Sequence, residues 1–309
     1  MDDHRPPVTL PFALLVAILA VSTSSIFIRY AQREAPSLVI AALRLTFASL
    51  VLAPLALTRF RAELKALSRR DLLLGMLSGA FLAVHFATWI TSLEYTSVAS
   101  SVVLVSTGPL WVALLSPLIL KEPLTRAALS GMGLALIGGT VIGLSDACRL
   151  DRGLVCPPLA DFVQGRAFLG NFLALAGAWA VAGYLILGRS LRARMSLVPY
   201  IFVVYSMAAL VLALVMLAAG QTMSGLAPVT YLWILLLALA PQLIGHSTYN
   251  WALKYLPAAL VSVTTLGEPI GSAILAYFLL RETPSALTLF GGVLILAGIY
   301  VSSFSNKTR

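Results

Sequence analysis

The chain has 309 residues, of which 60% are hydrophobic and only 11% are charged, and its mean hydropathy is +0.95. A soluble domain has about 25% charged residues, so this composition excludes a soluble globular protein and predicts one embedded in the lipid bilayer. The net charge of +9 does not indicate a nucleic-acid partner, because basic loops in membrane proteins usually record orientation.

Hydrophobic runs divide the chain into regular segments. A spanning helix needs roughly 20 mostly apolar residues, and ten such runs are separated by short links with breakers such as Ala35-Pro36 and Glu282-Thr283-Pro284. They predict an all-α polytopic membrane protein with ten transmembrane helices. The runs cover residues 9–31, 36–58, 72–93, 96–120, 125–145, 167–188, 197–219, 229–253, 256–280 and 285–304.

The first run also resembles a signal peptide, because Leu10–Ala20 is followed by Val21-Ser22-Thr23, where cleavage is conceivable. Asp2 and Asp3 more than cancel the positive charge expected before such a peptide. We therefore expect the first span to be retained.

An internal repeat relates the two halves of the chain. Residues 93–145 reappear without a gap as residues 253–305, so that Leu93 matches Leu253 and Pro109 matches Pro269. Glu122 in the link after the fourth run likewise matches Glu282 after the ninth. The expected organisation is a first five-helix repeat over 1–145, an external loop over 146–166 and a second five-helix repeat over 167–309.

Basic residues favour one side of the membrane. With the amino terminus inside, most Lys and Arg fall in the inner links, for example Arg59 to Arg70 and Arg189 to Arg194. This positive-inside bias places both termini in the cytoplasm of a multi-pass protein of the cell's inner (plasma) membrane. Because each repeat has an odd number of spans, the two repeats insert with opposite orientations.

Both cysteines, Cys148 and Cys156, lie in the long external loop. In an oxidising exterior they could form a structural disulfide; the alternative is two unpaired thiols. Two cysteines and three scattered histidines predict no metal site, and no cofactor motif is present.

Two charged residues fall deep inside spans, away from the ends: Arg44 in the second and Glu268 in the ninth. A charge at the centre of a spanning helix costs ~2.5–3.5 kcal/mol and therefore normally has a protein or water partner. Counting the helical rise puts both about 12 Å below the outer edge. They are candidates for a substrate site, with Glu268 a proton-coupling candidate; the alternative is a buried ion pair that fixes helix packing.

Polar and aromatic side chains extend this candidate site. His85 and Trp89 share one face of the third span, and His246, Tyr249 and Asn250 cluster in the eighth. A neutral histidine can titrate near physiological pH, which makes His85 a second proton-coupling candidate. The competing interpretation is an ordinary hydrogen-bonded interior histidine.

Prolines and glycines predict two further features. Pro109 and Pro269 occupy equivalent positions in spans 4 and 9, where the missing backbone donor breaks a helix, so both mark candidate hinges. Spans 5 and 10 instead have repeated glycines and no charged residue away from their ends, which favours close helix packing. They predict a packing pair outside the core and leave open whether the protein is a monomer or a homodimer.

These features together resemble the drug/metabolite transporter superfamily, in particular its EamA-like family. The most specific elements are Leu-Gly-Glu-Pro at 266–269, Leu-Lys-Tyr at 253–255 and the basic-Glu links at 121–122 and 281–282. The resemblance covers almost the whole chain. It implies a secondary carrier, often an exporter of amino acids, other metabolites or drugs, although the external loop is longer than is usual in the family.

We therefore expect alternating-access transport of a small organic solute through a cavity between the two halves. Coupling of this transport to protons is left open. A passive channel or facilitator is the alternative, but the chain has no rings of like groups. An enzyme is not expected, because no HExxH, GxSxG or Asp-dyad pattern occurs.

Overall fold

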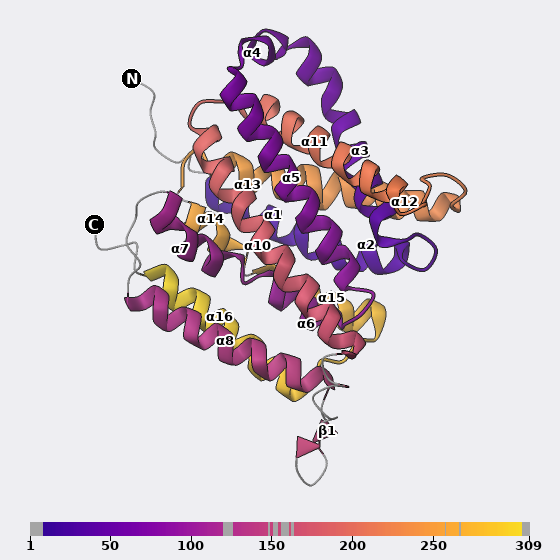
Figure 1. Cartoon of the computed structure of the whole chain (residues 1–309), viewed down its shortest axis with the longest axis vertical. Coiled ribbons are helices and arrows are strands. Elements are labelled where there is room, and N and C mark those ends of the chain that lie inside the picture. Colours follow the sequence, from indigo (N-terminus) through magenta and orange to yellow (C-terminus); the bar gives the residue numbers. More distant parts are fainter. Residues whose placement is uncertain are drawn as a thin grey trace.

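The computed structural model describes residues 9–119, 126–147, 149–150, 154–155, 161, 164–256, 258–265 and 267–304. The described chain is almost entirely helical (Figure 1). Its first-half helices are α1 (Leu10–Ser22), α2 (Ser24–Ala31), α3 (Ser37–Thr58), α4 (Arg61–Ala66), α5 (Arg69–Ser92), α6 (Val98–Val105), α7 (Gly108–Ile119) and α8 (Arg126–Ala147). Those of the second half are α10 (Arg166–Arg192), α11 (Leu197–Ala218), α12 (Pro228–Leu237), η1 (Ala238–His246), α13 (Ser247–Ala252), α14 (Ala258–Thr264), α15 (Gly267–Leu280) and α16 (Ala286–Phe304).

Seven helices or joined helices are long and apolar enough to cross a membrane. Three shorter apolar helices, Leu129–Ile142, Gly267–Leu280 and Ala286–Gly298, complete the set among the described residues. Each of these segments falls on one of the ten predicted runs. Among the described elements, the helix that the hydrophobic runs did not predict is the short, polar α4, which lies in the link after the second run.

Three of the predicted spans are broken within the bundle. The fourth breaks at Ser106-Thr107 and the ninth between Thr264 and Gly267, so that Pro109 becomes the second residue of α7 and Pro269 the third residue of α15. A proline is accommodated there because the first turn of a helix has no use for its backbone donor. The first span also breaks, at Thr23, where serine and threonine hydroxyls bond to the carbonyls of Ile18 and Ala20.

The eighth span changes its winding where the sequence predicts only a continuous helix. It runs from α12 into a π-helix, η1, and then into α13. Pro241 lies inside η1, and a proline ring collides with the preceding turn of a regular α-helix. Wider π turns relieve such conflicts and are frequent at functional sites.

The strongest helix pairs join one repeat to the other. The third span (α5) packs along the sixth (α10), and the first span (α1) packs in the equivalent way along the eighth (η1 and α13). The fourth span contacts the sixth just as the ninth contacts the first. Two groups of helices result, each drawn from both repeats: α5, α6, α7 and α10 form the first group, and α1, η1, α13 and α15 form the second.

Helices α8 and α16 lie side by side at one edge of the bundle (Figure 1). Their backbones meet at glycines: a Cβ atom added to Gly138 would lie 2.5 Å from the oxygen of Gly291, and one on Gly298 would lie 2.4 Å from the oxygen of Gly131. Large apolar side chains such as Leu136 and Val293 point outward. The predicted packing pair of spans 5 and 10 is thus present.

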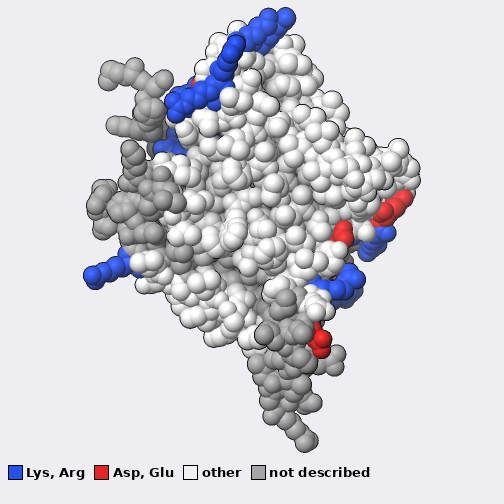
Figure 2. Space-filling model, in the orientation of Figure 1, with Lys and Arg blue, Asp and Glu red and all other residues white. Residues whose placement is uncertain are grey.

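Charged residues gather at two opposite edges of the molecule and leave a broad uncharged region between them (Figure 2). Several of them close the ends of helices, where backbone N–H groups have no partner within the helix. Four glutamates each accept a hydrogen bond from the backbone N–H at the start of a helix in another element. The pairs are Glu34 with Ala227 (2.9 Å), Glu63 with Ser196 (2.7 Å), Glu94 with Ser37 (3.2 Å) and Glu282 with Val98 (2.9 Å).

Within the loop over 146–166, which is predicted to be external, strands β1 (Arg149–Leu150) and β2 (Leu154–Val155) pair antiparallel, with Arg149 opposite Val155. Cys148 and Cys156 lie outside the described residues, as do Lys121 and Glu122. The disulfide therefore stays a prediction, which mass spectrometry under non-reducing conditions can test.

Candidate functional site

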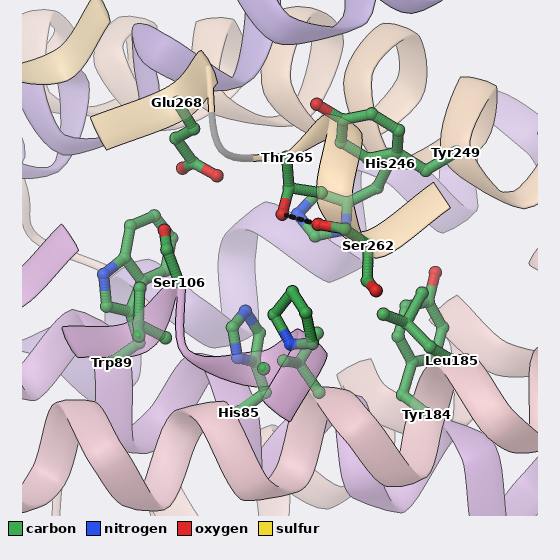
Figure 3. Close-up of a pocket in the computed structure, with 14 residues that line it drawn as sticks. His85, Trp89, Ser106, Tyr184, Leu185, His246, Tyr249, Ser262, Thr265 and Glu268 are labelled. Atoms are coloured by element: carbon green, nitrogen blue, oxygen red, sulfur yellow. Dashed lines mark hydrogen bonds between the residues drawn. The ribbon is translucent and has the colours of Figure 1, made fainter. Parts of the chain in front are cut away.

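A cavity of about 60 Å³ lies between the two groups of helices (Figure 3). Both repeats contribute to its wall, and the fourth and ninth spans supply residues next to their breaks. This volume holds a few water molecules, whereas pockets for organic ligands measure ~300–1,000 Å³. In this conformation the cavity is therefore too small for an organic solute. The lining residues are His85, Trp89, Val105, Ser106, Gly108, Pro109, Val181, Tyr184, Leu185, His246, Tyr249, Ser262, Thr265 and Glu268.

Aromatic rings form much of the wall. Trp89 stacks on His85, one turn away along α5, with their ring centroids 5.8 Å apart, and His85 lies 6.3 Å from His246 of the opposite group. Tyr249 follows with an edge contact to His246 at 6.4 Å. The indole Nε1 of Trp89 and the hydroxyl of Tyr249 are buried without a hydrogen-bond partner. The wall can therefore contact an apolar or aromatic group and still offer polar atoms to it.

His85 is anchored to the neighbouring helix. Its Nδ1 lies 2.9 Å from the backbone oxygen of Gly177 in α10, so in the neutral ring this nitrogen is the donor and Nε2 is the acceptor. Gly177 favours this approach, because a Cβ atom there would lie only 3.2 Å from the Thr88 hydroxyl and 3.3 Å from Trp89. One nitrogen of His85 thus has a fixed structural partner, as the interior-histidine interpretation holds, while the ring still faces the cavity.

Glu268 is the acidic residue of the cavity wall. It lies in the first turn of α15, directly after the break in the ninth span, and its carboxylate points into the cavity on the side of Trp89 and Ser106 (Figure 3). The first turn of a helix carries partial positive charge and stabilises an anion. The helix break therefore both exposes this carboxylate to the cavity and supports its charge.

Arg44 is completely buried but does not line the cavity. Its guanidinium lies over the ring of Phe86, 3.9 Å from the centroid, and Phe86 in turn contacts the ring of His246 at 5.3 Å. Arg44 and Glu268 interact electrostatically but make no direct ion pair; the ion pairs among the described residues are Arg29–Glu282 and Arg194–Asp71. The simple buried ion pair considered from the sequence is thus not formed in this conformation.

Asn250 also lies away from the cavity wall, within a buried hydrogen-bond network. Its amide donates to the hydroxyl of Tyr184 and, at 2.9 Å, to the carbonyl of His246. Arg192 donates to its backbone oxygen at 3.0 Å. These contacts tie α13 to α10 and make Asn250 a structural residue in this conformation.

The structure adds residues that sequence reasoning missed. Gln242 accepts a hydrogen bond from Nε of Arg44 at 2.9 Å, and Phe86 separates Arg44 from the cavity. The repeat offered a signal for Phe86, because it matches His246 just as Trp89 matches Tyr249. Nothing in the sequence singled out Gln242, because its orientation depends on the π turn. In the described part of the chain, no three His, Cys, Asp or Glu side chains converge as a metal site requires.

The fold and the cavity define a multi-pass helical membrane protein built from two related repeats. The chain belongs to the EamA-like transporter family, which matches residues 10–144 and 168–304. It is 24% identical over 296 residues to an uncharacterized transporter of Archaeoglobus fulgidus, covering 94% of this chain and 96% of that protein.

A second relative, the uncharacterized transporter YetK of Bacillus subtilis, is 24% identical over 302 residues, covering 96% of this chain and 87% of the relative. A solved crystal structure shares the fold, with a TM-score of 0.67 and 20% identity over 97% of this chain and 98% of that one. The chain is therefore a membrane transporter rather than an enzyme.

Proposed function

We propose that the protein is a secondary active transporter that exports a small organic metabolite, amino acid or drug-like solute by alternating access. Ten spanning helices form two inverted repeats in the inner membrane, and both termini are cytoplasmic. The observation that carries the proposal is the small cavity between two groups of helices. Glu268 lines it, and the rings of His246 and Phe86 separate it from the buried guanidinium of Arg44. An alternating-access carrier needs such a central cavity, which widens towards one side at a time when the two groups of helices move.

The chemistry follows from the cost of buried charge. Arg44 and Glu268 compensate each other electrostatically at a distance when no solute is bound. A solute that takes Arg44 as its partner leaves Glu268 to bind a proton or a cationic group of the solute, because an unpaired buried anion is strongly unfavourable. Glu268 is thus the first candidate for proton coupling, and His85 is the second.

For the solute to reach Arg44, the rings of Phe86 and His246 have to separate. Such an edge contact contributes about 0.5–1.5 kcal/mol, which a conformational change can overcome. The helix breaks beside Pro109 and Pro269 are the proposed hinges, and the aromatic wall of Trp89 and Tyr249 would hold the body of the solute.

Counterflow in proteoliposomes tests the proposal. Vesicles with the purified chain are preloaded with one unlabelled amino acid, carboxylate or amine at a time, and exchange with the labelled solute is measured with and without a pH gradient. A saturable, solute-specific exchange that responds to the gradient supports a proton-coupled carrier. Unitary conductance in a planar bilayer, without exchange, would identify the passive channel and overturn the proposal.

A further inference from the structure

The guanidinium of Arg44 is held by only one of its three nitrogens. Its Nε donates to the side-chain oxygen of Gln242, and the face of the group lies on Phe86. Both terminal nitrogens are buried without a hydrogen-bond partner, in a side chain whose exposure is 0%. Burying donors of a charged group unsatisfied is costly, so a partner for these two nitrogens is expected during the transport cycle.

Gln242 is built into the bundle from several directions. It is fully buried, and its backbone carbonyl accepts a hydrogen bond from the hydroxyl of Ser247 at 3.3 Å. Gln242 and His246 are four residues apart in the π-helix η1, so one segment holds Arg44 and also supplies a ring of the cavity wall. Any movement of η1 therefore acts on Arg44 and on the cavity together.

The hydrogen bond to Gln242 decides how an anion can approach Arg44. A carboxylate binds a guanidinium through two parallel N–H···O bonds, either side-on through Nε and one terminal nitrogen or end-on through both terminal nitrogens. Gln242 occupies Nε, and Phe86 covers one face. Only the end-on approach remains, which fits a planar two-oxygen group better than a single hydroxyl or amide.

We propose that Gln242 is a positioning residue that presents Arg44 for end-on recognition, and that the transported solute carries a carboxylate bound in this way. This inference rests on the proposed transport function. The π-helix then has a specific purpose, because it directs the amide of Gln242 towards Arg44 while His246 remains on the cavity wall.

The test compares two probes of the same shape, phenylacetate and phenylacetamide, chosen because aromatic rings line the cavity. Binding to the purified full chain is measured by isothermal titration calorimetry for wild type, Gln242→Met and Gln242→Glu. Wild type should prefer the carboxylate to the amide. Gln242→Met, which keeps the length and loses the acceptor, should lower the carboxylate affinity at least ~10-fold, the effect of losing one hydrogen bond to a charged group, with little change for the amide.

Gln242→Glu places an internal carboxylate beside Arg44 and should abolish the preference for phenylacetate, although the folded state keeps its contact to Nε. Equal losses for both probes would mean that Gln242 has only a structural role and would overturn the inference. It would equally be overturned if the wild-type protein bound the amide as well as the acid, or bound neither. If the inference failed but counterflow of a neutral or cationic solute were measured, the proposed transport function would still hold.

Discussion

Arg29 and Arg189 make the same contact at equivalent positions of the two repeats. Nη1 of Arg29 donates to the backbone oxygen of Leu93, and Nη1 of Arg189 donates to the backbone oxygen of Leu253. Helices α5 and α10 run antiparallel, with Tyr95 beside Gly170 at one end, so the two arginines lie at opposite ends of the bundle. The repeat is thus expressed in matching side-chain bonds as well as in helix order.

The Arg29 end is closed by an additional ion pair. Arg29 lies 3.1 Å from Glu282, which also accepts the backbone N–H of Val98 at the start of α6. The two side chains are 25% and 28% exposed, and ion pairs at that exposure contribute only about 0–1 kcal/mol. The contact can therefore hold this end shut and still open during a transport cycle.

We expect Arg29→Gln and Arg189→Gln to open opposite ends of the bundle. A cysteine introduced at Ser106 reports on the cavity, in a background with Cys148→Ser and Cys156→Ser, and a membrane-impermeant maleimide is applied from either side. Arg29→Gln should increase labelling from the outer side, and Arg189→Gln should increase it from the inner side. If both variants raised labelling from the same side, the two contacts would not be equivalent gates.

Arg44→Gln and Glu268→Gln should each reduce counterflow at least ~10-fold, because each leaves the other charge buried without compensation. Glu268→Gln should also remove the response of transport to a pH gradient, whereas Arg44→Gln should retain it in the residual rate. Wild-type rates in both variants would rule out these residues as the core of the site. The matched control is Arg33→Gln, because Arg33 is an exposed arginine in the link between α2 and α3.

The contribution of Glu34 to the stability of the fold should depend on pH. The Thr230 hydroxyl, and after it the Ala227 backbone N–H, lower the pKa of this carboxyl in the folded state. A lowered folded-state pKa stabilises the protein above the unfolded pKa of about 4.3, and this contribution disappears as the pH falls through the folded-state pKa. Glu34→Gln should therefore lower the unfolding temperature at pH 7, and the difference from wild type should shrink at and below about pH 4. Thermal unfolding in detergent measures both, and a constant difference across this range would contradict the assignment.

Gly138→Val should weaken the pairing of α8 with α16, because a Cβ atom there would lie 2.5 Å from the oxygen of Gly291. Overpacking of this kind costs about 1–3 kcal/mol, and we expect a lower unfolding temperature. Gly133→Ala is the control in the same helix, because its Cβ atom meets nothing within 4 Å. This variant should match wild type or exceed it slightly, since alanine favours helix.

The sequence predicted the helical segments well because hydrophobic runs and charged links have strong local signals. It also located the breaks beside Pro109 and Pro269. The break at Thr23 and the π turn at Pro241 were missed, because they depend on local hydroxyl bonds and on how one turn accommodates a proline ring. Hydropathy does not record either effect.

Some residues of the cavity wall could be predicted from the sequence. His85 and Trp89 share one helix face, and Glu268 is a charged residue deep inside a span. The positions of Arg44 and Asn250 were harder to predict, since helical rise gives the depth of a residue but not the neighbour that it faces. Phe86 and Gln242 decide that Arg44 is separated from the cavity in this conformation. Their role appears only when the second and eighth spans are placed side by side.

The pairing of helices across the repeats determines which parts can move. The cavity lies between α5, α7 and α10 on one side and η1, α13 and α15 on the other. Since η1, α13 and α15 pack on α1, each side combines helices from both halves of the chain. The rigid bodies of a transport cycle would therefore be assembled from non-contiguous stretches of sequence. Spin labels on α5 and α10 should keep a constant separation while labels on α5 and α15 change theirs, although α5 and α10 belong to different repeats.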